Sequence, residues 1–129
     1  METPKPNGMK ATFNRGDHLI NIELQILMFV EEEVHFVYSP ALDLTGYGTT
    51  GKEAMKSFSV VLEEFVKYTE NKKTVYKELM RLGWTVNQRK KRVHPPLEEE
   101  LLEDNETYRD LKGNPNVYQS STKVGLALA

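Results

Sequence analysis

The chain has 129 residues, with 17 Lys and Arg against 19 Asp and Glu, and it contains no cysteine. This length predicts one domain with tails and a core that is stable without disulfides, and the cysteine count excludes disulfide staples, thiolate metal sites and a cysteine nucleophile. The longest apolar run, 26–30, is far too short to cross a bilayer. Because residues 1–8 hold no apolar signal core, the sequence predicts a soluble cytoplasmic protein without a membrane partner.

The net charge of −2 hides two blocks of opposite sign. Residues 72–94 carry eight Lys or Arg and one acid, whereas residues 97–110 carry seven acids and one Arg. Such neighbouring blocks either neutralise each other in the fold or present two surfaces to two partners. A plain solvated surface is the commoner reading of a charge run.

The first part of the chain predicts a hairpin after a flexible lead-in of residues 1–17, which are polar and contain Pro and Gly. Residues 18–30 alternate apolar and polar side chains, which predicts a strand with one wet face. Residues 31–33 are three glutamates of turn length and residues 34–38 are again β-rich, so the two runs form a hairpin. The apolar side of the first strand is Ile20, Ile22, Leu24 and Ile26, opposite Asn21, Glu23 and Gln25.

A short third strand and a long helix follow the hairpin. Gly46 and Gly48 allow a bulge or a tight bend, so any strand here is short. Thr50 and Glu53 fit a capping box, in which the Thr50 hydroxyl accepts from the Glu53 amide and the Glu53 side chain reaches back. We therefore expect a helix over 50–70 with one apolar stripe toward the sheet. The stripe is Ala54, Phe58, Val61, Leu62, Phe65 and Tyr68.

The second half of the chain predicts shorter elements. A second helix begins at Lys73 or Thr74 and ends at Gly83, which sits where a C-terminal cap glycine belongs. Residues 84–86 look like a returning strand, and residues 87–92 form a basic loop or hairpin tip. Beyond two prolines, the sequence predicts an acidic helix over 97–106, a turn at 113–116 and a candidate closing strand within 117–128.

These elements predict the α+β class. The expected architecture is a short antiparallel sheet of three or four strands packed by one long helix, with a second helix and an irregular C-terminal extension. Residues 18–86 form the α+β domain, and residues 87–129 form the basic loop, the acidic helix and the extension.

A turn and a helix start follow the hairpin in a recognisable order. Over residues 19–70 the pattern resembles the HicB-like antitoxin family, in which a Pro-Asp-Leu-Pro-Gly turn leads to a Gly-Asp-Thr-x-x-Glu-Ala helix start. The chain has Thr45 and Thr49 at two positions of that pattern, and no C-terminal ribbon-helix-helix or helix-turn-helix signature is evident. The matching positions are Asp43, Leu44 and Gly46, then Gly48, Thr50, Glu53 and Ala54.

The resemblance implies a partial RNase-H-like fold that has lost nuclease chemistry, and a role as the neutralising partner of a small HicA-type RNA-cleaving toxin. The chain is then not an enzyme, and we expect no catalytic, cofactor or metal residue. The residues expected to carry the structural motif are Asp43, Gly46, Gly48, Thr50, Glu53, Phe58 and Phe65.

A relict metal-dependent nuclease is one alternative. Such an enzyme needs several carboxylates that converge on two Mg²⁺ ions. The available carboxylates are Glu23, Asp43, Glu63 and Glu64, but Glu23 falls on the polar side of its strand, and Asp43 is typical of a residue that organises a turn. The three histidines, 18, 35 and 94, lack ligand spacing, and we expect His35 on the exposed side of its strand.

A nucleic-acid-binding module is the second alternative. Arg89, Lys90, Lys91 and Arg92 follow Trp84 closely, and they can contact a nucleic-acid backbone or a protein partner. The simpler reading is a solvated hairpin tip with Trp84 in the core.

A homodimer is also expected, because a sheet of few strands has open edges. The apolar run 27–30 is a candidate dimer seam, since a fold this small has little to cover both faces of its sheet. The alternative is that the acidic helix and the C-terminal strand cover this run within one chain.

Overall fold

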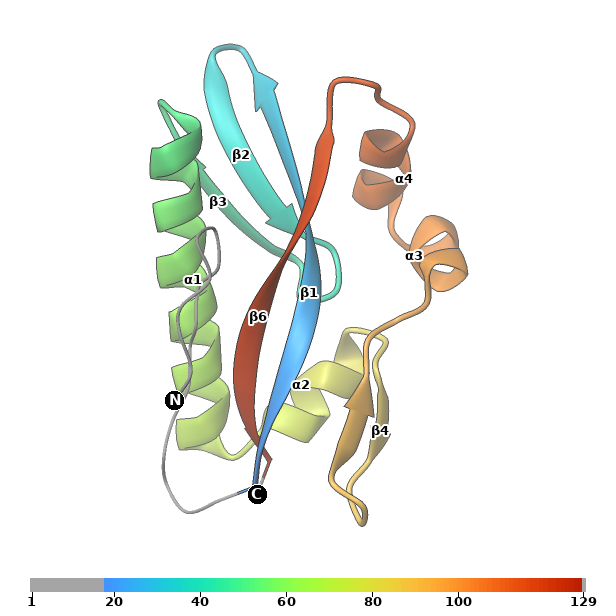
Figure 1. The fold of residues 1–129 in the computed structure, drawn as a ribbon. Helices are drawn as coiled ribbons and strands as arrows, with labels where there is room; N and C mark the ends of the chain where they lie inside the picture. The colour runs from blue at the N-terminus through green and yellow to red at the C-terminus, as the bar shows by residue number, and fades with distance from the viewer. Residues whose placement is uncertain (1–17, 129) are drawn as a thin grey trace.

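The computed structural model describes residues 18–128, so the lead-in expected at 1–17 lies outside the described residues. The described chain has the α+β class that the sequence predicts, with a four-stranded antiparallel sheet in the order β3-β2-β1-β6 and a separate hairpin, β4-β5 (Figure 1). The elements are β1 (His18–Glu31), β2 (Val34–Ser39), β3 (Leu44–Gly48), α1 (Gly51–Lys72), α2 (Val75–Arg81), β4 (Thr85–Asn87), β5 (Arg92–His94), α3 (Glu98–Asp104), α4 (Glu106–Lys112) and β6 (Tyr118–Leu128).

Strand β1 supplies apolar side chains to both faces of the sheet. Ile22, Leu24 and Ile26 are buried in the core that contains α1 and α2, which we call the inner face. Leu27 is buried on the opposite, outer face, against α4. Successive side chains of a strand alternate, so the end of β1, where the apolar run is continuous, serves two cores at once.

Helix α1 covers the inner face through a stripe that repeats every three to four residues. The predicted stripe is correct for Ala54, Phe58 and Leu62, but Tyr68 is 55% exposed and points away from the core. Phe65 is only partly buried beside this core. The buried residues of α1 are Ala54, Phe58, Leu62, Val66 and Thr69.

The two glycines of β3 let α1 approach the strand at backbone distance. A Cβ atom at Gly46 would lie 2.3 Å from the Phe58 amide nitrogen, and one at Gly48 would lie 2.6 Å from the Glu53 Cβ. Both positions pair regularly with β2. The third strand is short, as predicted, but its regular pairing leaves no bulge at these glycines, and the close approach of the helix is the reason for glycine here.

The start of α1 confirms half of the expected capping box. The Thr50 hydroxyl accepts a hydrogen bond from the Glu53 amide at 3.1 Å. The Glu53 carboxylate reaches back one residue further than expected, and accepts from the Thr49 hydroxyl at 2.6 Å and from the Thr49 amide at 3.0 Å. Both hydrogen bonds lower the pKa of Glu53, and the bond from the Thr49 hydroxyl has the larger effect.

Helices α3 and α4 cover part of the outer face (Figure 1). Tyr108 and Leu111 of α4 pack on Leu27 and Tyr38 of the sheet. The sequence predicts one acidic helix over 97–106, whereas the structure has two short helices in this region. The second begins because the Asn105 side chain accepts from the Tyr108 amide at 2.9 Å, which caps a new helix.

Strand β6 confirms the closing strand predicted within 117–128, and because this strand completes the sheet, the description of the C-terminal extension as irregular is wrong. All 11 residues of β6 pair with β1, from Tyr118 opposite Met28 to Leu128 opposite His18. Because β3 runs in the same direction as β1, a strand placed beside β1 directly after α1 would run parallel to it. The elements from α2 to α4 carry the chain to the other end of the sheet, and β6 therefore enters antiparallel.

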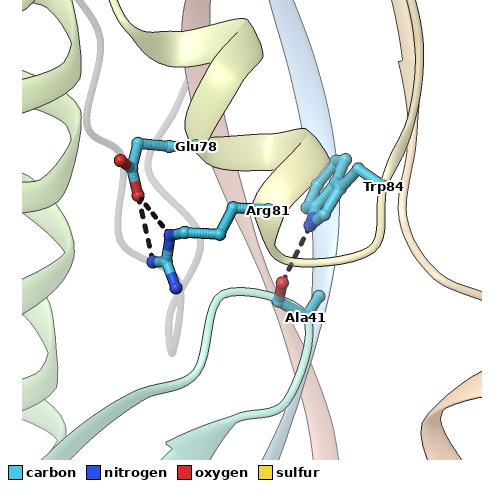
Figure 2. Close-up of polar contacts among 4 residues, drawn as sticks. All are labelled: Ala41, Glu78, Arg81 and Trp84. Atoms are coloured by element: carbon cyan, nitrogen blue, oxygen red, sulfur yellow. Dashed lines mark hydrogen bonds and ion pairs between the residues drawn. The ribbon is translucent and has the colours of Figure 1, made fainter. Parts of the chain in front are cut away.

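The β4–β5 hairpin is anchored to the main body by Trp84. The indole Nε1 donates to the Ala41 carbonyl at 2.8 Å, and the side chain is 4% exposed (Figure 2). Arg81, at the end of α2, instead pairs with Glu78 of the same helix at 3.0 Å (Figure 2). Just beyond α2, Gly83 has a φ of 94°, the left-handed conformation expected of a glycine that ends a helix.

The β1–β2 turn provides a stability test. Glu31 pairs with Val34, and Glu32 and Glu33 between them have φ values of 50° and 67°, which is the pattern of a type I′ turn. This turn favours Asn-Gly, and left-handed backbone costs other residues about 1 kcal/mol each. We expect Glu32→Asn with Glu33→Gly to raise the free energy of unfolding by about 1–2 kcal/mol in urea denaturation.

The matched control for this test is Glu32→Gln with Glu33→Gln, which removes the same two charges but keeps both Cβ atoms in the left-handed conformation. It should gain little stability. An equal gain in both variants would mean that charge, and not backbone conformation, is the cause.

Candidate interaction surfaces

The four basic residues predicted as contacts lie at the tip of the β4–β5 hairpin. The Asn87 side chain accepts from the Lys90 amide at 3.1 Å, and Lys91 adopts a left-handed φ of 54°, so the turn is tight. Arg89, Lys90 and Arg92 are exposed. No ion pair involves these side chains within residues 18–128. The hairpin therefore presents an uncompensated positive tip.

The acidic block does not neutralise this tip. Its ion pair in the described part of the chain joins Glu98 of α3 to Lys112 of α4 at 3.4 Å. Of the two outcomes open at the level of sequence, the structure thus favours two separate charged surfaces.

A hydrogen-bonded group of three side chains, Tyr38, Asp43 and Asn105, which we call the polar node, fixes α4 to the sheet. The Tyr38 hydroxyl donates to Asp43 Oδ1 at 2.9 Å and accepts from Asn105 Nδ2, also at 2.9 Å. Asp43 lies in the β2–β3 turn with a left-handed φ of 55°. Burial raises the pKa of Tyr38 to about 12, and the bond and charge of Asp43 add to the rise, while the bond from Asn105 opposes it.

This node borders a hollow of about 540 Å³ between the β2–β3 turn, the end of α2 and the helices α3 and α4. The charged residues that line it are Asp43, Arg81, Glu100, Asp104 and Glu106. The described residues contain no group of three or more His, Cys, Asp or Glu that could hold a metal ion.

The carboxylates weighed for a nuclease lie on different parts of the fold. Glu23 is on the outer face, where it accepts from the Ser121 hydroxyl at 2.7 Å. Glu63 and Glu64 are exposed on α1, and Asp43 lies in the β2–β3 turn. The structure therefore does not assemble these four groups into one centre.

The expectation for His35 is wrong. Its side chain lies on the same side of β2 as the buried Val37 and is half-buried near the start of α1, where its Nδ1 would lie 3.8 Å from a Cβ atom at Gly51. His94 is exposed and its Nδ1 lies 2.8 Å from the Pro95 carbonyl oxygen. The side chain of His18 lies outside the described part of the structure.

The end of the sheet beside the β1–β2 turn is only partly covered. On the outer face, three rings from three adjacent strands form an aromatic ladder: Phe29 and Phe36 stack at 5.2 Å between centroids, and Tyr47 follows at 6.4 Å. Phe29 and Phe36 are half-buried, and Tyr47 is 65% exposed. The acidic turn, Glu31–Glu33, borders this ladder and is exposed.

The inner face at the same end contains a cavity of about 500 Å³. Met28, Val37 and Ala54 line it, and the exposed Val30 and Tyr118 stand at the same end of the sheet. The helix α1 begins too close to β3 to fill this space.

The run 27–30 is therefore covered within the chain only in part. Leu27 is fully buried under α4, as the single-chain alternative expects. Phe29 is half-buried, and Val30 is 53% exposed. A homodimer through this run stays a prediction.

Comparison with protein-family models, with curated proteins and with solved structures gave no match to this chain. Among the described helices, none is both long and apolar enough to cross a membrane.

Sequence reasoning missed the aromatic ladder. Phe29, Phe36 and Tyr47 are each visible in strand-like runs, but only the pairing of Phe29 with Phe36, and of Phe36 with Tyr47, places them in one row. The turn of three glutamates fixes the first of these pairings. A register counted outward from that turn would have found two of the three rings.

The raised pKa of Tyr38 predicts a loss of stability at high pH. Unfolded tyrosine loses its proton near about pH 10, whereas folded Tyr38 keeps it up to about pH 12. The folded state binds more protons in this window, so the free energy of unfolding falls as pH rises through it. We expect Tyr38→Phe to flatten that fall, and to cost about 1–2 kcal/mol at neutral pH because two hydrogen bonds are lost.

Urea denaturation between pH 7 and pH 11.5 measures both effects. Tyr47→Phe, which removes the hydroxyl of an exposed tyrosine, is the control and should keep the slope of the unmodified protein. The same alkaline slope in Tyr38→Phe would show that this hydroxyl is not the group responsible.

Proposed function

We propose that this chain is a non-catalytic, antitoxin-like binding protein that neutralises a small HicA-type RNA-cleaving toxin by protein–protein contact. The observation that carries the proposal is the close contact of α1 with β3. Gly46, Gly48, Thr50 and Glu53, which carry the resemblance to HicB-like antitoxins, are the residues that make this contact and cap the helix.

The packing supports a partial RNase-H-like layer as the scaffold. A hairpin and a short third strand are followed by one helix that packs on one face of the sheet, as the resemblance implies. Phe58, fully buried, packs from that helix into the core, and Phe65 lies at its margin. In this proposal the scaffold supplies a rigid surface for binding and takes no part in chemistry.

The proposal predicts a toxin gene beside the gene for this chain. Its product, expressed alone, should arrest growth and cleave RNA, and co-expression of this chain should restore growth. The purified pair should form a stable complex in size-exclusion chromatography. Gly46→Val, which drives a side chain into the backbone of α1, should abolish rescue because the helix can no longer pack.

Lys123→Ala, an exposed position on β6, is the control and should rescue as well as the unmodified chain. If no such toxin gene is adjacent, or if its product binds and yet remains active, the proposal is wrong.

The basic tip of the β4–β5 hairpin favours a second candidate function, nucleic-acid binding. Its four cationic side chains form no ion pair in the described structure, so they are available to nucleic-acid phosphates. Binding through contacts between cations and phosphates depends strongly on salt concentration. The rigid anchor at Trp84 holds the tip in a fixed position. Cations at such a tip contact the phosphates of the nucleic acid, and such contacts do not distinguish one base sequence from another.

A gel-shift assay tests this candidate. At low salt, the unmodified protein should shift RNA, and replacement of Arg89, Lys90, Lys91 and Arg92 by Ala should abolish the shift. The control replaces four exposed lysines of α1 by Ala, namely Lys52, Lys56, Lys67 and Lys72, which removes the same charge from another surface. No shift with the unmodified protein, or an equal loss in the control, would exclude a specific role for the tip.

A further inference from the structure

The aromatic ladder has the composition of a protein-binding surface. Tyr47 lies on the edge strand β3 and is 65% exposed, and the row continues toward α4 through Phe36 of β2 and Phe29 of β1. Exposed aromatic rings in a rigid frame lose little entropy when they are buried, and such rings dominate the binding energy of protein interfaces. Here the frame is three hydrogen-bonded strands, so the rings are held in place before any partner arrives.

The ladder is left open by the way in which the outer face is covered. The cover ends at Tyr108 and Leu111 of α4, which bury Leu27 and Tyr38. The next row of the sheet, toward the β1–β2 turn, contains the ladder. The apolar surface is thus continuous with the core, and a partner would extend the cover that α4 begins.

The acidic turn determines which partner fits. Glu31, Glu32 and Glu33 are exposed beside the ladder, and no ion pair satisfies them within the described structure. Three uncompensated carboxylates at the border of an apolar surface repel nucleic-acid phosphates and attract a cationic protein. The positive β4–β5 tip lies at the other end of the molecule in Figure 1, so it does not cancel this field at short range.

An RNA-cleaving protein must have the complementary surface. It binds phosphates through Lys and Arg around its active site. A protein that covers such a site replaces the phosphates with its own carboxylates. We infer that the ladder, Phe29, Phe36 and Tyr47, and the acidic turn together form the surface that docks on the basic RNA-binding face of the toxin partner. This inference rests on the proposed function and adds the location of the contact.

The first test changes the ladder. Phe36→Thr with Tyr47→Thr removes two rings and replaces them with β-branched residues, which suit a strand. Binding of an inactivated form of the adjacent toxin should weaken at least about tenfold in calorimetry, as is usual for the loss of central aromatic residues. Tyr68→Ala, an exposed aromatic residue on α1, is the control and should leave affinity unchanged. Thermal unfolding of each variant confirms that it is folded.

The second test changes the acidic turn. Replacing Glu31, Glu32 and Glu33 by Gln should slow association about tenfold at low salt, and the difference should shrink as salt is added. Replacing Glu63, Glu64 and Glu99 by Gln removes the same charge from other exposed positions and should have a smaller effect. The stabilising pair Glu32→Asn and Glu33→Gly should also slow association, because it removes two of the three carboxylates.

The outcomes separate the two claims. If the toxin does not bind the unmodified chain, the proposed function fails and the inferred surface fails with it. If the toxin binds and is neutralised but the ladder and turn variants bind as well as the controls, only the surface is wrong. Tighter RNA binding by the Gln variant, without any loss of toxin binding, would assign this end of the sheet to nucleic acid instead.

Discussion

The close contact between α1 and β3 is the constraint on which the rest of the structure depends. Because Gly46 and Gly48 have no side chains, the backbone of α1 lies directly against β3, an edge strand of the sheet, and does not cross the centre of the sheet. The helix therefore fills only part of the inner face. Beneath β1 and β6 the core is completed by α2 and by Trp84, whose indole is bonded to the turn between β2 and β3.

The same constraint leaves one end of the sheet incomplete. Helix α1 starts beside β3, and the cavity lined by Met28 and Val37 remains between its first turn and the strands. On the outer face, α4 is held by the bond from Asn105 to Tyr38, so its position is fixed over Leu27 and it does not reach the β1–β2 turn. Both faces of the hairpin end are consequently apolar and partly open, which is unusual for a small protein without an interaction partner.

Much of this arrangement follows from local sequence patterns. The alternation of Ile22, Leu24 and Ile26, the cap at Thr50 and the helix end at Gly83 each depend on neighbouring residues, and each prediction is confirmed. Helix α4 was not predictable in this way. Only two of its residues, Tyr108 and Leu111, are buried, so its apolar stripe is short. Its N-cap, Asn105, lies inside an acidic run whose sequence predicts one continuous helix.

The remaining errors concern contacts between distant segments. The sequence at Gly46 and Gly48 looks the same whether a glycine serves a bend or a helix that approaches closely, and only the position of α1 distinguishes the two. The pairing of β6 with β1 joins segments about 100 residues apart, so no local signal contains it. The aromatic ladder could not be predicted for the same reason, because its three rings form a row only when the register of three strands is known.

The charge pattern acquires its meaning from this geometry. The described structure has no ion pair between the basic block and the acidic block, although they are adjacent in sequence. Four of the eight basic residues lie at the tip of the β4–β5 hairpin and the others lie on or beside α1 and α2, whereas the acidic residues belong to the short helices α3 and α4. The strongest acidic group beside an apolar surface is instead the β1–β2 turn, which belongs to neither block. If the partner is an RNA-binding toxin, as proposed, it is itself basic, and charge then favours the ladder end over the positive tip as its docking surface. The two candidate contacts can therefore be separated by mutation, because each attracts the kind of partner that the other repels.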